Sequence, residues 1–191
     1  MDKEGAKNLL INLLTQAFSG ELAAALAYEG HAESVYDVTE RKEILDIRND
    51  ELHHRERVLL MMRELGGSVE EVLECKMNII GKTVSILCRI GKWLPGGWFF
   101  SMYGAGRLES KNIDEYERAA RHAWVSGNYN LVGELLEFAE VEWEHEKYFR
   151  DKVNSHVLSR WVPLWKIPPE KQHIRESFVK FTSDYNALDK I

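Results

Sequence analysis

The stretch "DELHHRE", residues 50–56, places a glutamate three positions before the second of two adjacent histidines. On an α-helix, residues three apart lie on one face, so Glu51 and His54 can bring a carboxylate and an imidazole to one point. Such a pair can bind a metal ion. With 23 glutamates and 7 histidines in 191 residues, about one Glu-x-x-His is expected by chance. The chain has three: Glu51/His54, Glu142/His145 and Glu170/His173.

The overall composition limits the classes of protein that fit the chain. Its 191 residues, 45% of them hydrophobic, suffice for one domain with a buried core. The net charge of −6 argues against general nucleic-acid binding. The first residues lack a signal-peptide pattern. The chain also lacks an 18-residue apolar run, so we expect no membrane-spanning helix. Two cysteines are too few for a disulfide framework or a built-in rubredoxin-type iron site. We therefore expect a cytoplasmic protein.

The spacing of apolar residues predicts an all-α fold. Leucines such as Leu9 and Leu13 recur at helical intervals, and the first 92 residues contain no proline. Asp37 and Glu40 form a capping-box pattern, and "SVEE" at 68–71 forms another. We expect helices at about 4–35, from the Asp37 turn to 65, at 68–92, 98–125 and 130–155, and a short one after Pro169.

The predicted helices form a four-helix bundle with an appendage. Short turns join the helices into two antiparallel pairs, and residues 68–97 connect the pairs as a long crossover segment. The stretch "SRWVPLWKIPPE", residues 159–170, is irregular. We expect residues 1–155 to form the bundle and residues 156–191 to form a C-terminal extension with a short helix.

A weak internal repeat distinguishes two of the three Glu-x-x-His pairs from a match that arises by chance. "ELAAALAYE" at 21–29 and "ESKNIDEYE" at 109–117 both read Glu, six residues, Tyr, Glu. Each is followed about 30 residues later by a Glu-x-x-His, which starts at Glu51 or Glu142. Residues equidistant from the turn of an antiparallel pair lie at one height, and both midpoints fall in or beside expected turns. Each pair thus places one glutamate level with one Glu-x-x-His.

Two such pairs facing one another supply four glutamates and two histidines. A dinuclear iron or manganese site in a helix bundle needs this set, and its charges balance two divalent cations. Glu170/His173 has no matching upstream helix pair and follows two prolines in a polar stretch, so we expect it on the surface. The predicted metal ligands are Glu21, Glu51, His54, Glu109, Glu142 and His145.

With this ligand set, the chain resembles the ferritin-like di-iron carboxylate proteins over about residues 8–152. "GELAAALAY" at 20–28 and "LESKNIDEY" at 108–116 are similar to motifs of the demethoxyubiquinone hydroxylase family. Rubrerythrin-like peroxidases are the second choice, but they often carry a further glutamate where this chain has Asn112. The resemblance implies a ferritin-like bundle in which Glu51 and Glu142 bridge two metal ions.

The resemblance implies an oxidoreductase with two iron ions, or with manganese in one or both positions. It would use O₂ or peroxide, with electrons from an external donor, to oxidise an apolar, quinone-like substrate as a monooxygenase does. The alternatives are a rubrerythrin-like peroxidase, a ferroxidase or another iron-handling protein. A third interpretation is a non-catalytic helical protein with a structural metal site.

Residues 76–106 have two interpretations. The segment is apolar and carries basic but no acidic residues from 75 to 92. A basic amphipathic helix is typical of a membrane surface, here the inner face, and the hydroxylases that the chain resembles have such a segment. The alternative is a crossover helix packed on the bundle or on a second subunit of a homodimer. The basic residues are Lys76, Lys82, Arg89 and Lys92.

Several aromatic residues and histidines lie near the predicted ligands. Tyr28 and Tyr116 lie two turns beyond their glutamates, and their rings tilt back toward them. They would act as catalytic residues by hydrogen-bonding the residues that surround the ligands or by relaying electrons, and the alternative is ordinary core packing. His53 points off the ligand face and is expected on the surface. His31 and His122 lack a partner pattern and are expected to be structural.

Overall fold

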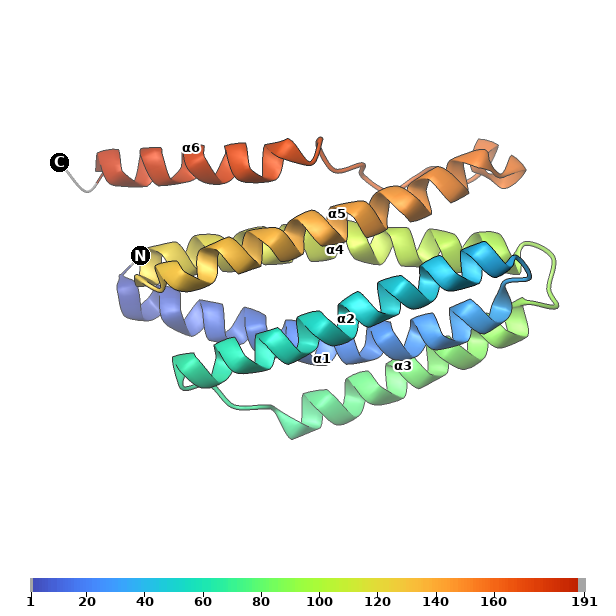
Figure 1. Ribbon diagram of the computed structural model, residues 1–191, viewed down its shortest axis with the longest axis horizontal. Helices are drawn as coiled ribbons and strands as arrows, with labels where there is room; N and C mark the ends of the chain where they lie inside the picture. Colours follow the sequence, from blue (N-terminus) through green and yellow to red (C-terminus); the bar gives the residue numbers. More distant parts are fainter. Residues whose placement is uncertain (1, 189–191) are drawn as a thin grey trace.

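The computed structural model describes residues 2–188 and shows a bundle of long helices (Figure 1). No strand occurs in this part of the chain, which confirms the predicted all-α fold. Residue 1 of the predicted bundle and residues 189–191 of the predicted extension lie outside the described range. The elements are α1 (Lys3–Ser34), α2 (Val38–Leu65), α3 (Glu71–Gly91), α4 (Gly97–Ser126), α5 (Tyr129–Ser155), the 3₁₀ helix η1 (Val157–Arg160) and α6 (Gln172–Leu188).

Short polar and glycine motifs fix several helix ends. The Asp37 carboxylate accepts a hydrogen bond from the backbone N–H of Glu40 at 2.9 Å, which satisfies a donor in the first turn of α2. Gly66 and Gly127 end α2 and α4 with φ of 81° and 85°. A residue with a Cβ is strained in this left-handed conformation, so glycine favours the turn at both positions.

Helix α3 begins later than the Ser68 capping pattern predicts. It starts at Glu71 without a side-chain cap, so the predicted cap at Ser68 is wrong. Contacts that the first turn of α3 makes with α1 and α2 explain why the helix begins at Glu71. Glu74 forms an ion pair with Arg55 of α2 and accepts a hydrogen bond from Ser19 of α1 at 3.2 Å. These contacts anchor the start of α3 to two neighbouring helices.

Four helices form two antiparallel pairs, α1 with α2 and α4 with α5, and α1 also lies along α4 (Figure 1). Helix α3 lies on the outside of this bundle, against α1, and runs in the same direction as α1. The predicted crossover segment therefore packs on the bundle through one of its faces.

Glycines allow α3 to approach α1 closely. A Cβ on Gly30 would lie 2.2 Å from the carbonyl oxygen of Ser85, and one on Gly81 would lie 2.7 Å from Cα of Ala23. Both positions require glycine, because backbone atoms cannot move aside as a flexible side chain can. The outer face of α3 is exposed in the monomer and includes Ile79, Ile86, Leu87 and Ile90.

Helix α1 is the one helix within residues 2–188 that is long and apolar enough to span a membrane, although the sequence analysis expects none. Half of its most apolar window is buried in the bundle, and core helices of globular proteins share this composition. Glu21 lies in this helix and is 3% exposed. We therefore assign α1 to the core of the bundle.

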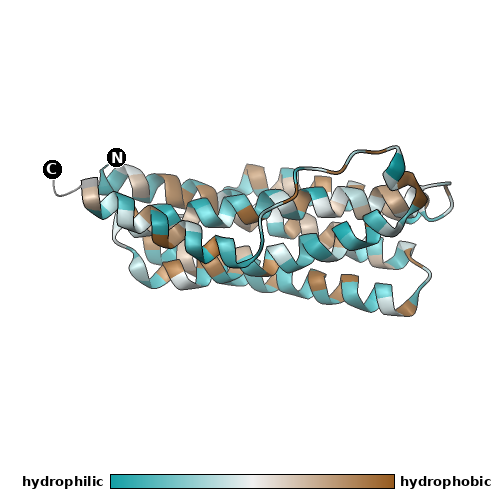
Figure 2. Ribbon diagram, turned by 90° about the horizontal axis from the view of Figure 1, so that it is seen from above, coloured by the Kyte–Doolittle hydropathy of each residue, from teal (hydrophilic) through white to brown (hydrophobic). Residues whose placement is uncertain are grey.

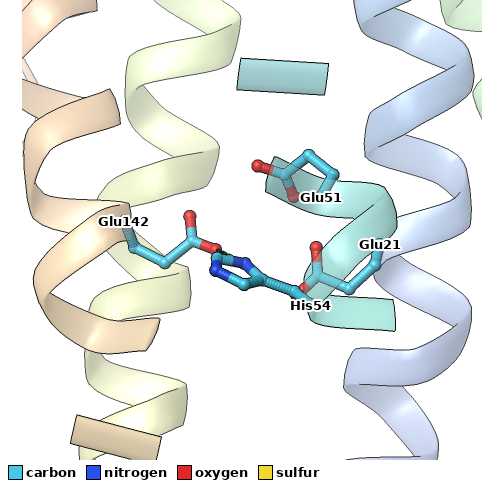
Figure 3. A group of neighbouring side chains, drawn as sticks. All are labelled: Glu21, Glu51, His54 and Glu142. Atoms are coloured by element: carbon cyan, nitrogen blue, oxygen red, sulfur yellow. Dashed lines mark hydrogen bonds and ion pairs between the residues drawn. The ribbon is translucent and has the colours of Figure 1, made fainter. Parts of the chain in front are cut away.

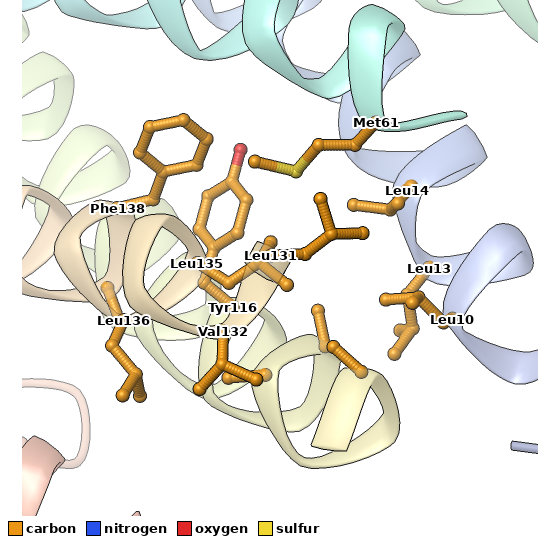
Figure 4. Packing of buried hydrophobic residues seen from close by; sticks show 14 of the residues in the cluster. Leu10, Leu13, Leu14, Met61, Tyr116, Leu131, Val132, Leu135, Leu136 and Phe138 are labelled. Carbon is orange, nitrogen blue, oxygen red and sulfur yellow. The ribbon is translucent and has the colours of Figure 1, made fainter. Parts of the chain in front are cut away.

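Buried apolar side chains form two clusters, one on each side of a polar layer. The first lies toward the N-terminal end of α1 (Figure 4) and includes Leu10, Leu14, Met61 and Leu135. The second lies toward the C-terminal end of α1 and includes Tyr28, Ile44, Phe99 and Phe149. Burial of these side chains stabilises the bundle and encloses the polar layer in surroundings of low dielectric constant.

The C-terminal extension begins after α5, where the sequence analysis places it, and runs along the outside of the helices before α6 (Figure 2). Between residues 154 and 173, Trp165 is the only buried side chain. Helix α6 packs on the first core cluster through Ile174 and Phe178.

Candidate metal centre

All six predicted ligands converge in the polar layer between the two core clusters. Helices α1, α2, α4 and α5 each supply one or two of them, and Figure 3 shows four of the side chains pointing toward one another. Their exposed fractions range from 0% to 5%. The six residues are Glu21, Glu51, His54, Glu109, Glu142 and His145.

The ligand-type atoms form two overlapping groups, and within each group these atoms lie within 4.8 Å of one another. The first group consists of Glu21, Glu51, His54 and Glu142. The second group consists of Glu51, Glu109, Glu142 and His145. Glu51 and Glu142 belong to both groups, as is expected of carboxylates that bridge two metal ions.

Several buried polar atoms of these residues have no hydrogen-bond partner within the described chain. Burial without a partner is costly for a carboxylate, because it removes the water that would solvate the charge. Divalent cations would satisfy these atoms, and carboxylate and imidazole donors suit manganese and iron. The residues present therefore fit a dinuclear metal site. The unpaired atoms are Glu21 Oε2, both Glu51 carboxylate oxygens, Glu109 Oε1 and His145 Nδ1.

Each histidine turns its Nδ1 toward the carboxylates. His54 Nδ1 lies 3.1 Å from Glu142 Oε1. His145 Nδ1 lies 3.4 Å from Glu51 Oε1, and its Nε2 lies 3.1 Å from Asp50 Oδ2. With a proton on Nε2, His145 donates to Asp50 and keeps Nδ1 available to a metal ion, an arrangement that raises ligand basicity.

Asn112 connects predicted ligands of two helices. Its Nδ2 donates to Glu109 Oε2 at 3.1 Å and to Glu142 Oε2 at 3.4 Å. The sequence analysis notes this position as a departure from the rubrerythrin-like pattern but assigns it no contact. The amide is neutral, so it ties α4 to α5 without adding a further charge to the site.

The surroundings of the carboxyl groups shift their pKa values in opposite directions. Burial, and next the charge of a neighbouring carboxylate, raise the pKa of Glu21 and of Glu109 well above the ordinary value. Burial also opposes ionisation of Glu142. The nearby His145 imidazole and the hydrogen bond from His54 outweigh it and hold the pKa of Glu142 below the ordinary value.

The pKa values of His54 and His145, the two predicted ligand histidines, are raised, which favours the protonated imidazoles. Burial lowers the pKa of His145, but the hydrogen bond to Asp50 and the nearby Glu142 carboxylate outweigh it and raise the pKa above the ordinary value. Burial likewise opposes the charge on His54, and the hydrogen bond to Glu142 again raises the pKa. Without metal, protons on both imidazoles and on the two carboxyl groups of raised pKa compensate the negative charge of the site.

The two tyrosines have different surroundings. The Tyr116 hydroxyl donates to Glu21, and its ring contacts His54 edge-on with 5.8 Å between ring centroids. The Tyr28 hydroxyl has no partner among residues 2–188, and its ring stacks on Phe149 at 5.7 Å. Tyr116 therefore touches a predicted ligand, whereas Tyr28 packs in the core.

Five other histidines lie outside the two candidate groups. His53 and His173 are exposed, and His122 and His156 are half-buried. His173 belongs to the third Glu-x-x-His, which the sequence analysis expects on the surface. His31 is buried and stacks on Phe149 at 5.9 Å, and burial lowers the pKa of its imidazole to about 4. His31 is therefore a neutral core side chain at pH 7.

A cavity of about 650 Å³ lies between α1, α3 and α4. Glu21, Asn112 and Tyr116 line it, so it reaches the polar layer. The sequence analysis does not predict this cavity, because its size depends on the gap between three helices. Most of the remaining wall is apolar and includes Ala24, Ile80, Val84, Leu87, Leu94 and Phe100.

No protein-family model matches the chain, and neither does a curated protein or a solved structure. The site itself has three informative properties: the duplicated set of predicted ligands, the unpaired buried oxygens and the cavity that extends to them.

Proposed function

We propose that the protein is a ferritin-like dinuclear iron or manganese oxidoreductase that oxidises an apolar organic molecule with O₂ or peroxide. The observation that carries this proposal is the apolar cavity lined by Glu21, Asn112 and Tyr116. A site that only stored iron or supported the fold would need no such cavity, whereas an apolar substrate does. The ligand set and its unpaired oxygens support the metal-binding part of the proposal.

The side chains of the site bind, orient and protect the reacting groups. When bound, the metal ions supply redox chemistry with O₂ or peroxide, and an external donor supplies electrons. Asp50 fixes the tautomer and orientation of His145, and Tyr116 holds a proton on its hydroxyl against Glu21. The two core clusters enclose the layer on two sides. The residues that would hold the metal ions are Glu21, Glu51, His54, Glu109, Glu142 and His145.

The outer surface of α3 supports entry of the substrate from a membrane surface. Leu87 of α3 and Leu94 of the connection to α4 are both 59% exposed and also line the cavity, so the exposed apolar surface is continuous with the cavity wall. Lys76 and Lys82 are exposed on α3. A surface that combines apolar and basic residues favours an anionic membrane, from which an apolar molecule could reach the cavity directly.

Substrate-dependent O₂ consumption by iron-loaded protein tests the proposal. With a reductant present, apolar phenols and quinols should accelerate O₂ uptake, and ¹⁸O from ¹⁸O₂ should appear in the product. Gly104 lines the cavity, and a Cβ there meets nothing within 4 Å. Gly104→Leu should therefore fill part of the cavity and lower the substrate-dependent rate about 10-fold, the lower end of what one misplaced apolar group costs.

The matched control is Gly133→Leu on α5, where a Cβ also meets nothing within 4 Å but the residue does not line the cavity. This variant should keep the wild-type rate. O₂ or peroxide consumption that ignores the organic compound and is unchanged in Gly104→Leu would instead favour a peroxidase or iron-handling protein. Fewer than two metal ions bound per chain would contradict the proposal as a whole.

A further inference from the structure

Residues 161–171, called the C-terminal strap below, are attached to the bundle beside the polar layer. Trp165 is 9% exposed, and its indole Nε1 donates to Glu146 Oε1 at 2.8 Å. Glu146 is fully buried on α5 and also accepts from Arg150 Nε at 3.1 Å. This buried carboxylate thus has one donor from its own helix and one from the strap, and it follows the predicted ligand His145 directly.

The strap also contacts α4 near a predicted ligand. The Trp165 ring occupies the space over Gly106, where a Cβ would lie 2.4 Å from the indole Cη2. Ser110 Oγ donates to the carbonyl oxygen of Lys166 at 3.2 Å. Gly106 and Ser110 lie on either side of Glu109 in the sequence of α4. The strap therefore holds the turn of α4 that carries Glu109.

A third attachment lies on α5. Trp143 is 8% exposed, and its Nε1 donates to the carbonyl oxygen of Pro169 at 2.7 Å. Trp143 directly follows Glu142 in the chain. The strap consequently crosses from α4 to α5 and is bonded, in both helices, to residues that neighbour predicted ligands.

We propose that the C-terminal strap positions the second ligand group and that Trp165 is its main positioning residue; this inference rests on the metal-binding part of the proposed function. Helices α4 and α5 supply three of the four members of the second group but one of the four members of the first. Ligands must be held within a fraction of an ångström, and the residues behind them do this. The strap therefore acts unequally on the two groups.

Cobalt(II) titration of metal-free protein separates the two groups, because bound Co²⁺ absorbs visible light and accepts carboxylate and imidazole ligands. Absorption lost in His54→Ala marks the first group, and absorption lost in His145→Ala marks the second. These two variants assign the spectrum, and wild-type protein then gives a dissociation constant for each group.

Trp165→Phe keeps an aromatic ring but cannot donate to Glu146. In this variant the dissociation constant of the second group should rise about 10-fold or more, the usual effect of removing a residue that orients metal ligands. The constant of the first group should stay within about twofold. Trp161→Phe is the control, because Trp161 belongs to the same strap and is 81% exposed. It should change neither constant.

Gly106→Ala tests the same contact from the other side. The added methyl group displaces the indole ring but leaves the strap sequence intact, and alanine is a better helix former than glycine. We expect the same selective loss at the second group. Gly104→Ala is the control two residues earlier in α4, since a Cβ there meets nothing within 4 Å. It should leave both constants unchanged.

The number of cobalt ions bound by the wild type tests the proposed function, and the affinities of the variants test the role of the strap. Wild-type protein that binds fewer than two cobalt ions would overturn the proposed function and the inference together. Two ions in the wild type, with both groups weakened equally or neither weakened in Trp165→Phe and Gly106→Ala, would overturn the positioning role alone. Loss of a cooperative thermal transition in both metal-free variants would also overturn it, because the strap would then support the whole bundle.

Discussion

Asp50 shows, at the scale of single residues, how a side chain outside the ligand groups can control them. Its carboxylate is half exposed and accepts from Nε2 of His145, whose Nδ1 lies 3.4 Å from Glu51. A carboxylate in this position keeps the proton on Nε2 and raises the basicity of Nδ1, the atom that faces the site. Asp46, one turn earlier on α2, instead pairs with Lys42 at the surface.

Asp50→Asn should therefore weaken metal binding by the second group about 10-fold and leave the first group within about twofold. The amide is the same size but is a weaker acceptor, so His145 loses its fixed tautomer. Asp46→Asn removes an equal charge from the same helix and should change neither dissociation constant. Cobalt titration of both variants distinguishes the hydrogen bond from the charge. Wild-type affinity in Asp50→Asn would show that Asp50 does not orient His145.

At the scale of helices, local signals account for what the sequence predicts well. Helices α1, α4 and α5 begin and end within one residue of the predicted bounds, because apolar spacing and turn residues such as Gly127 determine them. All six predicted ligands lie on the faces that this spacing predicts. The start of α3 and the contacts of Asp50 and Asn112 depend on how separate helices are placed and rotated against one another, which spacing along one segment does not determine.

Helix α3 uses its two faces differently. The inner face packs on α1, and at its end Arg89 pairs with Glu33 at 2.6 Å while Lys92 donates to the Glu33 carbonyl at 3.0 Å. These two basic side chains are engaged within the protein. Lys76 and Lys82 form no ion pair among residues 2–188, and both are exposed near the outer apolar face. They are therefore the basic residues best placed to contact an anionic surface.

The double variant Lys76→Glu/Lys82→Glu should bind anionic vesicles more weakly by about 2 kcal/mol, roughly 30-fold, because each basic residue near such a surface contributes about 1 kcal/mol. The difference should shrink at high salt, which screens exposed charges. Vesicle co-sedimentation measures it. Lys3→Glu/Lys180→Glu changes the net charge equally and is the control. Wild-type protein that never sediments with vesicles would show that the exposed face of α3 serves another contact.

At the scale of the whole molecule, the fold encloses a layer of ionisable groups between two apolar clusters, and this couples stability to protonation. Burial raises the pKa of Glu21 and Glu109 above 4.5, and hydrogen bonds outweigh burial to raise the pKa of His54 and His145 above 6.5. In the metal-free protein these groups hold protons that the unfolded chain releases. The folded chain therefore binds more protons than the unfolded chain near neutral pH.

The free energy of unfolding of metal-free protein should consequently fall as pH rises from 6.5, the ordinary histidine pKa, to about 9. Below 6.5, buried His31, with a pKa of about 4, acts in the opposite sense, and the lowered pKa of Glu142 matters only in acid. For each proton that only the folded chain retains, the free energy of unfolding falls by about 1.4 kcal/mol per pH unit, which lowers the melting temperature by about 4 °C. Metal ions replace these protons, so metal-loaded protein should melt higher and lose most of the dependence. Paired thermal melts across this range check both effects. A metal-free melting temperature that stays flat or climbs, with no gain from metal at the alkaline end, would mean that the four glutamates do not share one buried site.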